Sequence, residues 1–259
     1  MFAIYKKEMR SYFINPIGYV YMGIFLALSA LVFCYTTFQM KSYSTSIYFT
    51  YMIFAFVILI PLLTMRSFAE ERKMRTEQML LTAPVTIPGM VLGKYLAAFT
   101  MFLVSVLISC VNFIPLYAVA GEERRAAEYE SQAANIGPSG AAIVGGLIGI
   151  ILIGAAFIAI GVFISSLTDS QLAAAVSTIG VIVVMVVLGF VNDIGSDAEG
   201  TRLISSYAVR SVIDWISVLS RFDNFYSGKF DFAALFYYLS LSSVFLFLTM
   251  RIYERRRWG

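Results

Sequence analysis

The stretch that decides the fold of this chain is Pro61-Leu-Leu-Thr-Met-Arg-Ser-Phe-Ala-Glu-Glu-Arg-Lys-Met-Arg-Thr-Glu-Gln-Met-Leu-Leu-Thr-Ala-Pro84, with Leu92-Gly-Lys-Tyr95 shortly after it. One apolar run ends where this stretch begins, and a second apolar run begins at Met90. Both runs are long enough to cross a bilayer, which takes about 20 apolar residues. The charged residues between them therefore form a polar connector between two membrane spans.

The composition of the whole chain agrees with this interpretation. Of its 259 residues, 59% are hydrophobic and 14% are charged, and the mean hydropathy is +0.80. Soluble domains carry about 25% charged residues. Backbone groups in lipid must pair within their own segment, and apolar runs this long predict helices rather than barrel strands of about ten residues. We therefore expect an all-α membrane protein with a single transmembrane domain over residues 1–259.

Six membrane-spanning helices are predicted, at residues 17–38, 47–65, 90–119, 141–166, 172–191 and 232–251. Six crossings place both termini on the same side of the membrane. The third run is long for one crossing, so its first turns, around Lys94, are expected to project into water. Small residues recur four apart in the fourth span, which predicts close helix packing within the chain, with a second protomer as the alternative; they are Gly145, Gly149, Ala155 and Ala159.

Charge is distributed unevenly between the two sides. The side with both termini and the connector carries twelve cations against six acids, and the other side carries seven against ten, so the net charges are +6 and −3. An excess of lysine and arginine marks the cytoplasmic side. Both termini and the connector over residues 66–89 are therefore expected in the cytoplasm.

Two amphipathic segments flank the spans. Residues 1–15 repeat apolar side chains at helical spacing with charges between them, which predicts an interfacial helix that ends at Asn15-Pro16, a solvated N-terminus being the alternative. Residues 192–231, on the outer side, place Ile204, Ala208, Val212 and Trp215 on one helical face. This pattern predicts an amphipathic outer helix before the last span, or else a loop packed over the bundle. The polar segment 121–140 could continue the third helix by a turn or two.

Several classes of function are disfavoured by what the sequence lacks. It contains no histidine, and its two cysteines lie inside apolar runs, so neither a metal site nor a disulfide is expected. No acidic residue falls inside a predicted span, which argues against an ion-coupled carrier. Gly93-Lys94-Tyr95 lacks the other residues of a P-loop. We expect no enzymatic activity, no cofactor bound by this chain and no nucleic-acid partner.

A few polar side chains lie inside the predicted spans. Ser105, Ser109 and Asn112 are weak candidates for lining a transport pathway. Hydrogen bonding between helices is the favoured alternative, and Asn112, the residue least compatible with lipid, is expected to face the bundle or a partner.

The connector has the pattern of a docking segment. Glu71 and Arg75 are four apart and would pair if the second span continued as a helix. Thr76 could cap a short helix over residues 76–81 that ends at Ala83-Pro84 and exposes three apolar side chains. Apolar residues ringed by charge suit a groove on a soluble partner, although an ordinary charged loop is the alternative.

Several stretches resemble the signature of ABC-2 type permeases, and they occur in the family's order. They are Leu63 to Lys73, Thr76-Glu77, Leu80 to Pro84, Val91-Leu-Gly-Lys-Tyr95, Ala159 to Asp169, Ser220 to Gly228 and Tyr237 to Leu241. The nearest resemblance is to the gliding-motility (GldF-like) branch, with NosY-type permeases further off. Two positions depart from the family pattern: Arg75 stands where the family usually has glycine, and Lys229-Phe230-Asp231 replaces an apolar Val-Ile-Asp.

This resemblance implies a type V exporter-like fold and the membrane subunit of an ATP-binding cassette exporter in a bacterial cytoplasmic membrane. A second permease protomer, identical or homologous, would complete the pathway, and separate ATPase subunits would bind ATP and Mg. The family's coupling helix falls on residues 76–81. The residues to which the resemblance gives an ATPase-docking role are Glu70, Glu71, Arg72, Arg75, Thr76, Glu77, Met79, Leu80 and Leu81.

Two other functions stay open from the sequence. The chain could anchor an ATPase or transmit force from it without moving a solute. More weakly, it could be a channel or carrier that works without an ATPase. The transported substrate is not indicated by any motif.

Overall fold

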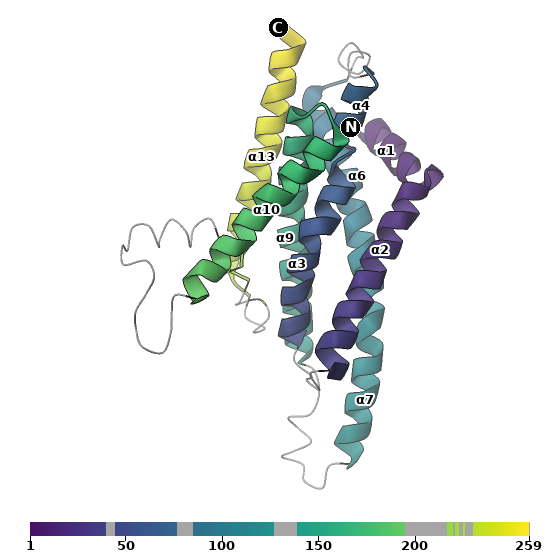
Figure 1. Ribbon diagram of the computed structural model, residues 1–259, viewed down its shortest axis with the longest axis vertical. Helices are drawn as coiled ribbons and strands as arrows, with labels where there is room; N and C mark the ends of the chain where they lie inside the picture. Colours follow the sequence, from purple (N-terminus) through teal and green to yellow (C-terminus); the bar gives the residue numbers. More distant parts are fainter. Residues whose placement is uncertain are drawn as a thin grey trace.

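The computed structural model describes residues 1–39, 45–76, 85–126, 139–194, 217–219, 221–222, 225 and 230–258 of the chain. In these residues the regular structure is helical throughout, and six helical segments are long and apolar enough to cross a membrane (Figure 1). The prediction of six spans in an all-α fold is confirmed. The spans are α2 (Pro16–Phe33), α3 (Thr45–Thr64), α6 (Ile87–Ser109) with α7 (Phe113–Ala126), α9 (Gly140–Leu167), α10 (Gln171–Ile194) and α13 (Phe232–Trp258).

The first helix, α1 (Phe2–Ile14), ends where the sequence predicts. Asn15 has an extended backbone, because Pro16 disfavours the helical conformation in the residue before it, and Pro16 itself starts α2. The two helices then touch closely: a Cβ at Gly18 would overlap the Tyr12 carbonyl oxygen. Beyond Phe33, α2 continues as a π-helix, η1 (Cys34–Gln39).

The third span is a long helix whose α-helical hydrogen bonding is interrupted once. Between α6 and α7 lies a 3-10 turn, η2 (Cys110–Asn112). Pro115 explains it, because proline has no N–H to donate to the carbonyl of Val111, four residues earlier. As expected, the rod continues past Gly121 by about a turn, to Ala126.

The most buried span is α9, which packs against α3, α6, α10 and α13. Its small residues permit these contacts. Cβ atoms at Gly146, Gly154 and Gly161 would overlap Phe49 of α3, Phe102 of α6 and Thr64 of α3. Packing within the chain, which was predicted for the small residues of the fourth span, is thus observed at these three glycines.

Both termini and the short helix α4 (Ala69–Lys73) lie at the same end of the bundle (Figure 1). We call this end, made of α1, α4 and the last turns of α13, the charged end. The last helix reaches further into it than predicted: α13 continues past Arg251 to Trp258. Tyr253 accounts for the extension, because it is buried and its ring lies 4.8 Å from that of Phe68.

Two predicted elements cannot be compared. Residues 77–81 of the predicted coupling helix lie outside the described residues. So does most of segment 192–231, including the predicted outer amphipathic helix.

Candidate functional site

The connector begins with a sharp turn at the charged end. The chain leaves α3 at Thr64 and turns over residues 65–68 before α4 begins. The turn is held by Ser165, a buried residue of α9. Its hydroxyl accepts hydrogen bonds from the backbone N–H groups of Phe68 (3.1 Å) and Ala69 (3.2 Å) and donates to the Met65 carbonyl (3.3 Å). A residue almost 100 positions away thus caps the start of α4, where N–H groups have no partner inside the helix.

Lys94 of α6 is the centre of the site. Its side chain is 2% exposed, and Nζ lies 2.9 Å from Glu8 Oε1 and 2.9 Å from Glu71 Oε1. Nζ also donates to the Ser67 carbonyl at 2.7 Å and lies 5.0 Å from the centre of the Phe68 ring. The expectation that Lys94 projects into water is wrong, because two carboxylates and a carbonyl replace its water shell. Burial of this cation joins α1, α4 and the α3–α4 turn to α6.

The Lys94 cluster, which we define as Lys94, Glu8, Glu71 and Lys7, has no net formal charge. Lys7 lies at the exposed edge, with Nζ 3.4 Å from Glu71 Oε1. Glu8 and Glu71 are largely buried, with side chains 17% and 15% exposed. Two anions and two cations at these distances offset the unfavourable desolvation of each charge, which an unpaired buried ion would suffer in full.

Two further ion pairs fix the connector. Arg66 binds Glu70 through two hydrogen bonds, Nε to Oε2 at 2.8 Å and Nη2 to Oε1 at 2.6 Å. Arg72 Nη1 lies 2.6 Å from Asp169 Oδ1 and donates to the Leu167 carbonyl at 3.0 Å. Through Arg72, α4 is therefore attached to the turn between α9 and α10.

Position 75, where arginine replaces the glycine usual in ABC-2 permeases, lies at the end of α4. Arg75 has a φ of 57°, in the left-handed region. The N–H of Arg75 donates to the Arg72 carbonyl (3.0 Å), and the N–H of Thr76 donates to the Glu71 carbonyl (2.9 Å). This pair of bonds is the Schellman motif, in which glycine is preferred at the left-handed position. This left-handed backbone is a physical reason for the glycine that the family usually has at this position. Arginine adopts the same conformation at a strain of about 1–2 kcal/mol.

The predicted pair between Glu71 and Arg75 is wrong for the same reason. The helix ends at Lys73, so the spacing of four no longer places the two side chains on one face. Glu71 instead binds Lys94. The Thr76 hydroxyl donates to the Glu71 carbonyl at 3.2 Å and so closes α4, while the helix that it was predicted to start lies outside the described residues.

A small cavity of about 30 Å³ lies beside the cluster, between α1 and the α3–α4 turn, which is room for a water molecule. Its lining includes Tyr12, whose hydroxyl donates to the Leu63 carbonyl at 3.5 Å. Burial raises the pKa of the Tyr12 phenol well above 10, and the nearby Glu8 carboxylate adds to the effect. Tyr12 therefore stays neutral over the physiological range.

The polar residues inside the spans form hydrogen bonds within the bundle. Asn112 Nδ2 donates to Ser29 Oγ at 2.8 Å, and Ser29 Oγ lies 2.9 Å from the Tyr48 hydroxyl. This network links α2, α3 and η2, so the expectation that Asn112 faces the bundle is confirmed. Ser105 and Ser109 are buried and donate to carbonyls of their own helix, at Met101 and Val106. Whether these three residues also line a pathway stays a prediction.

The site consists of ion pairs and hydrogen bonds that join α4 to α1, α6 and α9. Among the described residues, no group of three or more potential metal ligands of the His, Cys, Asp and Glu types occurs. Of the candidate docking residues, Glu70, Glu71 and Arg72 are brought together on α4, and each forms an ion pair inside the chain. The sequence analysis did not predict that Glu8 pairs with Lys94 or that Ser165 caps α4. Each of these contacts joins residues far apart in the sequence, so no local pattern indicates it.

Comparison with known proteins identifies one family. The family model described as ABC-2 family transporter protein matches residues 35–252, more than four-fifths of the chain. No curated protein matches the chain at a significant level.

Proposed function

The chain belongs to the ABC-2 transporter family and is a membrane permease of an ATP-binding cassette transporter, and on this premise we propose that it works as an exporter driven by separate ATPase subunits at its charged end. The proposal rests on one observation above all: α4 is fixed to several spans where the connector leaves the bundle. Lys94 joins α4 to α6, Ser165 joins it to α9, and Arg72 joins it to the turn before α10. A displacement of the connector would therefore move these spans together.

The ion pairs divide the connector into two parts with different roles. Glu70, Glu71 and Arg72 are engaged inside the chain, so we assign them to holding α4 on the bundle. The docking contact then falls on the segment that begins where α4 ends, with Thr76, Glu77, Met79, Leu80 and Leu81 as its candidates. Arg75 lies at the junction, where the left-handed backbone directs the chain away from the helix axis.

The charge distribution supports an orientation. The side with the charged end has twelve cations against six acids, and an excess of this sign is typical of the cytoplasmic face. We propose that both termini and the connector lie in the cytoplasm, with α1 against the membrane interface. Phe2 and Ile14 of α1 are exposed, whereas Ile4, Met9 and Tyr12 pack against the core, as expected of a helix with one side in lipid headgroups.

The resemblance to bacterial permeases further supports a cytoplasmic-membrane location and a second permease protomer, identical or homologous. ATP and Mg would be bound by the ATPase partner. Export, as the direction of transport, follows from the same resemblance.

A binding experiment with two kinds of variant tests the proposal. Leu80→Asp/Leu81→Asp places charges on the proposed docking surface, and we expect it to release the ATPase from the purified permease. Arg72→Gln loosens α4 but leaves that surface intact, so the ATPase should stay bound while the effect of the permease on its hydrolysis rate is reduced. Lys73→Gln, an exposed neighbour on α4, is the control and should change neither property.

The outcomes separate the alternatives. Retention of the ATPase by Leu80→Asp/Leu81→Asp would overturn the assignment of docking to this segment. Glu71→Lys is a poor test, because it would place another cation beside buried Lys94 and disturb the fold itself. A complex that assembles and hydrolyses ATP but moves no solute in vesicles would support the role of anchor or force transmitter instead.

A further inference from the structure

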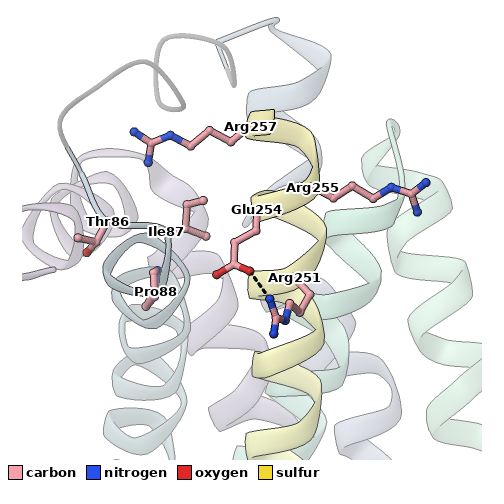
Figure 2. A pocket seen from close by; sticks show the side chains of 7 residues that line it. All are labelled: Thr86, Ile87, Pro88, Arg251, Glu254, Arg255 and Arg257. Atoms are coloured by element: carbon pink, nitrogen blue, oxygen red, sulfur yellow. Dashed lines mark hydrogen bonds and ion pairs between the residues drawn. The ribbon is translucent and has the colours of Figure 1, made fainter. Parts of the chain in front are cut away.

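A groove of about 830 Å³ opens at the charged end between the start of α6 and the last turns of α13 (Figure 2). One wall is formed by Thr86, Ile87 and Pro88, and the other by three arginines and Glu254 of α13. Figure 2 shows Arg257 extending toward the side of Thr86 and Ile87, above Glu254 and Arg251. The Lys94 cluster contributes no residue to the lining, so the groove is separate from the site described above.

The groove carries a clear excess of positive charge. Its lining contains Arg251, Arg255 and Arg257 against one acid, Glu254, which is already bound to Arg251 at 2.9 Å. On the opposite wall the first turn of α6 has no acidic residue, and a helix start adds partial positive charge. The groove therefore favours an anion, and arginine forks match the geometry of phosphate oxygens.

The position of the groove at the ends of two spans indicates the kind of anion. The helix α6 starts at Ile87, and the apolar run of α13 ends at Met250, after which residues 251–257 carry four arginines and one acid. From Arg251 to Arg257 the helix rises about 9 Å, close to the depth of the headgroup layer, about 5–8 Å on each side of the hydrocarbon core. Ile87 and Pro88 form an apolar wall opposite these arginines. A phospholipid has both an anionic phosphate and apolar acyl chains, so it matches a groove with arginines on one wall and apolar residues on the other. An acidic protein segment would need only the arginines.

We propose that this groove binds the phosphate group of an anionic phospholipid. Arg251 and Arg257 bind the phosphate oxygens, and Ile87 and Pro88 contact the glycerol and the first acyl carbons. The lipid would join the first turn of α6 to the end of α13, next to the connector. The proposal does not depend on the ATPase partner.

The test uses Trp258, the neighbour of Arg257 in the sequence, as a fluorescent reporter. Trp258 follows Arg257, and the only other tryptophan of the chain is Trp215. In full-length protein carrying Trp215→Phe, in nanodiscs, the quenching of Trp258 fluorescence by brominated phosphatidylglycerol is compared with quenching by brominated phosphatidylcholine. We expect the anionic lipid to be preferred. Arg257→Gln, which breaks no described ion pair, should lower the preference about fivefold, and Arg251→Gln/Arg257→Gln about 25-fold.

The controls decide between the possible occupants. Lys73→Gln/Arg75→Gln removes two cations from the same end but outside the groove and should keep the preference; an equal loss would show only general attraction to the charged surface and overturn the proposal. Unchanged thermal unfolding of each variant excludes misfolding as the cause. Release of quenching by inorganic phosphate would show a free-anion site. If both lipids quench Trp258 equally and a polyglutamate peptide shields Trp258 from quenching, the groove is a site for an acidic protein segment. Either the free-anion result or this result would refute the lipid site.

Discussion

Replacement of Lys94 by methionine removes the cation that contacts both buried carboxylates of the Lys94 cluster. Methionine keeps most of the volume of the side chain, so the change is mainly electrostatic. Glu8 and Glu71, 17% and 15% exposed, would face each other without the ammonium at 2.9 Å from each. Removal of one partner from a buried ion pair destabilises a protein by about 3–5 kcal/mol. For a chain of this size, that corresponds to a fall in Tm of about 6–20 °C.

The assay is thermal unfolding of the full-length protein in detergent, followed by circular dichroism. Lys73→Met is the matched control, because Lys73 is exposed on α4 and its loss should change the free energy of unfolding by less than about 0.5 kcal/mol. Lys94→Met/Glu71→Gln removes one of the stranded carboxylates as well. We expect the double variant to be more stable than the sum of the single changes by about 1–3 kcal/mol. A Lys94→Met protein that unfolds at the parent temperature would refute the role assigned to this cluster.

Four further changes probe other parts of the fold by the same unfolding assay. Arg75→Gly should raise the free energy of unfolding by about 0.5–1 kcal/mol, because glycine adopts the left-handed backbone without strain; a loss would contradict the Schellman assignment. Ser165→Ala leaves two buried N–H groups at the start of α4 without a partner and should destabilise by about 1–3 kcal/mol, so an unchanged Tm would count against the cap. Gly154→Ala, which would overlap an aromatic ring of α6, should cost about 1–3 kcal/mol, whereas Gly180→Ala meets open space and should not destabilise; equal effects would refute the packing argument. Tyr12→Phe tests pH dependence: because the folded-state pKa is raised, the parent loses stability as pH rises above 10, and the variant should lose less over that window, as parallel pH titrations of Tm would show.

The spans were predictable because lipid sets their length and composition. Each predicted span overlaps an observed helix, and α1 ends before Asn15-Pro16 as predicted. The end of α13 was predicted too early, since a rule of about 20 apolar residues stops at Arg251. The helix continues because Tyr253 packs on Phe68, a contact between residues 185 positions apart that no local pattern contains.

The candidate site was predictable in its location but not in its internal pairing. Charge density marked the connector, and the resemblance to ABC-2 permeases marked position 75, where the backbone favours glycine. A lysine near the end of a span suggests solvent exposure when its partners are unknown. Glu8 lies 86 residues before Lys94, and their pairing follows from the packing of α1 against α6. The assumed partner of Glu71, Arg75, was wrong because a spacing of four has meaning only while the helix continues.

We propose above that this permease is driven by an ATPase bound at its charged end. The most direct measurement is the composition of the complex isolated from native membranes in a mild detergent, determined by native mass spectrometry. We expect an ATP-binding cassette ATPase in equal molar amount to the permease, and we expect Leu80→Asp/Leu81→Asp to release it. A permease that is isolated intact from cross-linked membranes without an ATPase would contradict it.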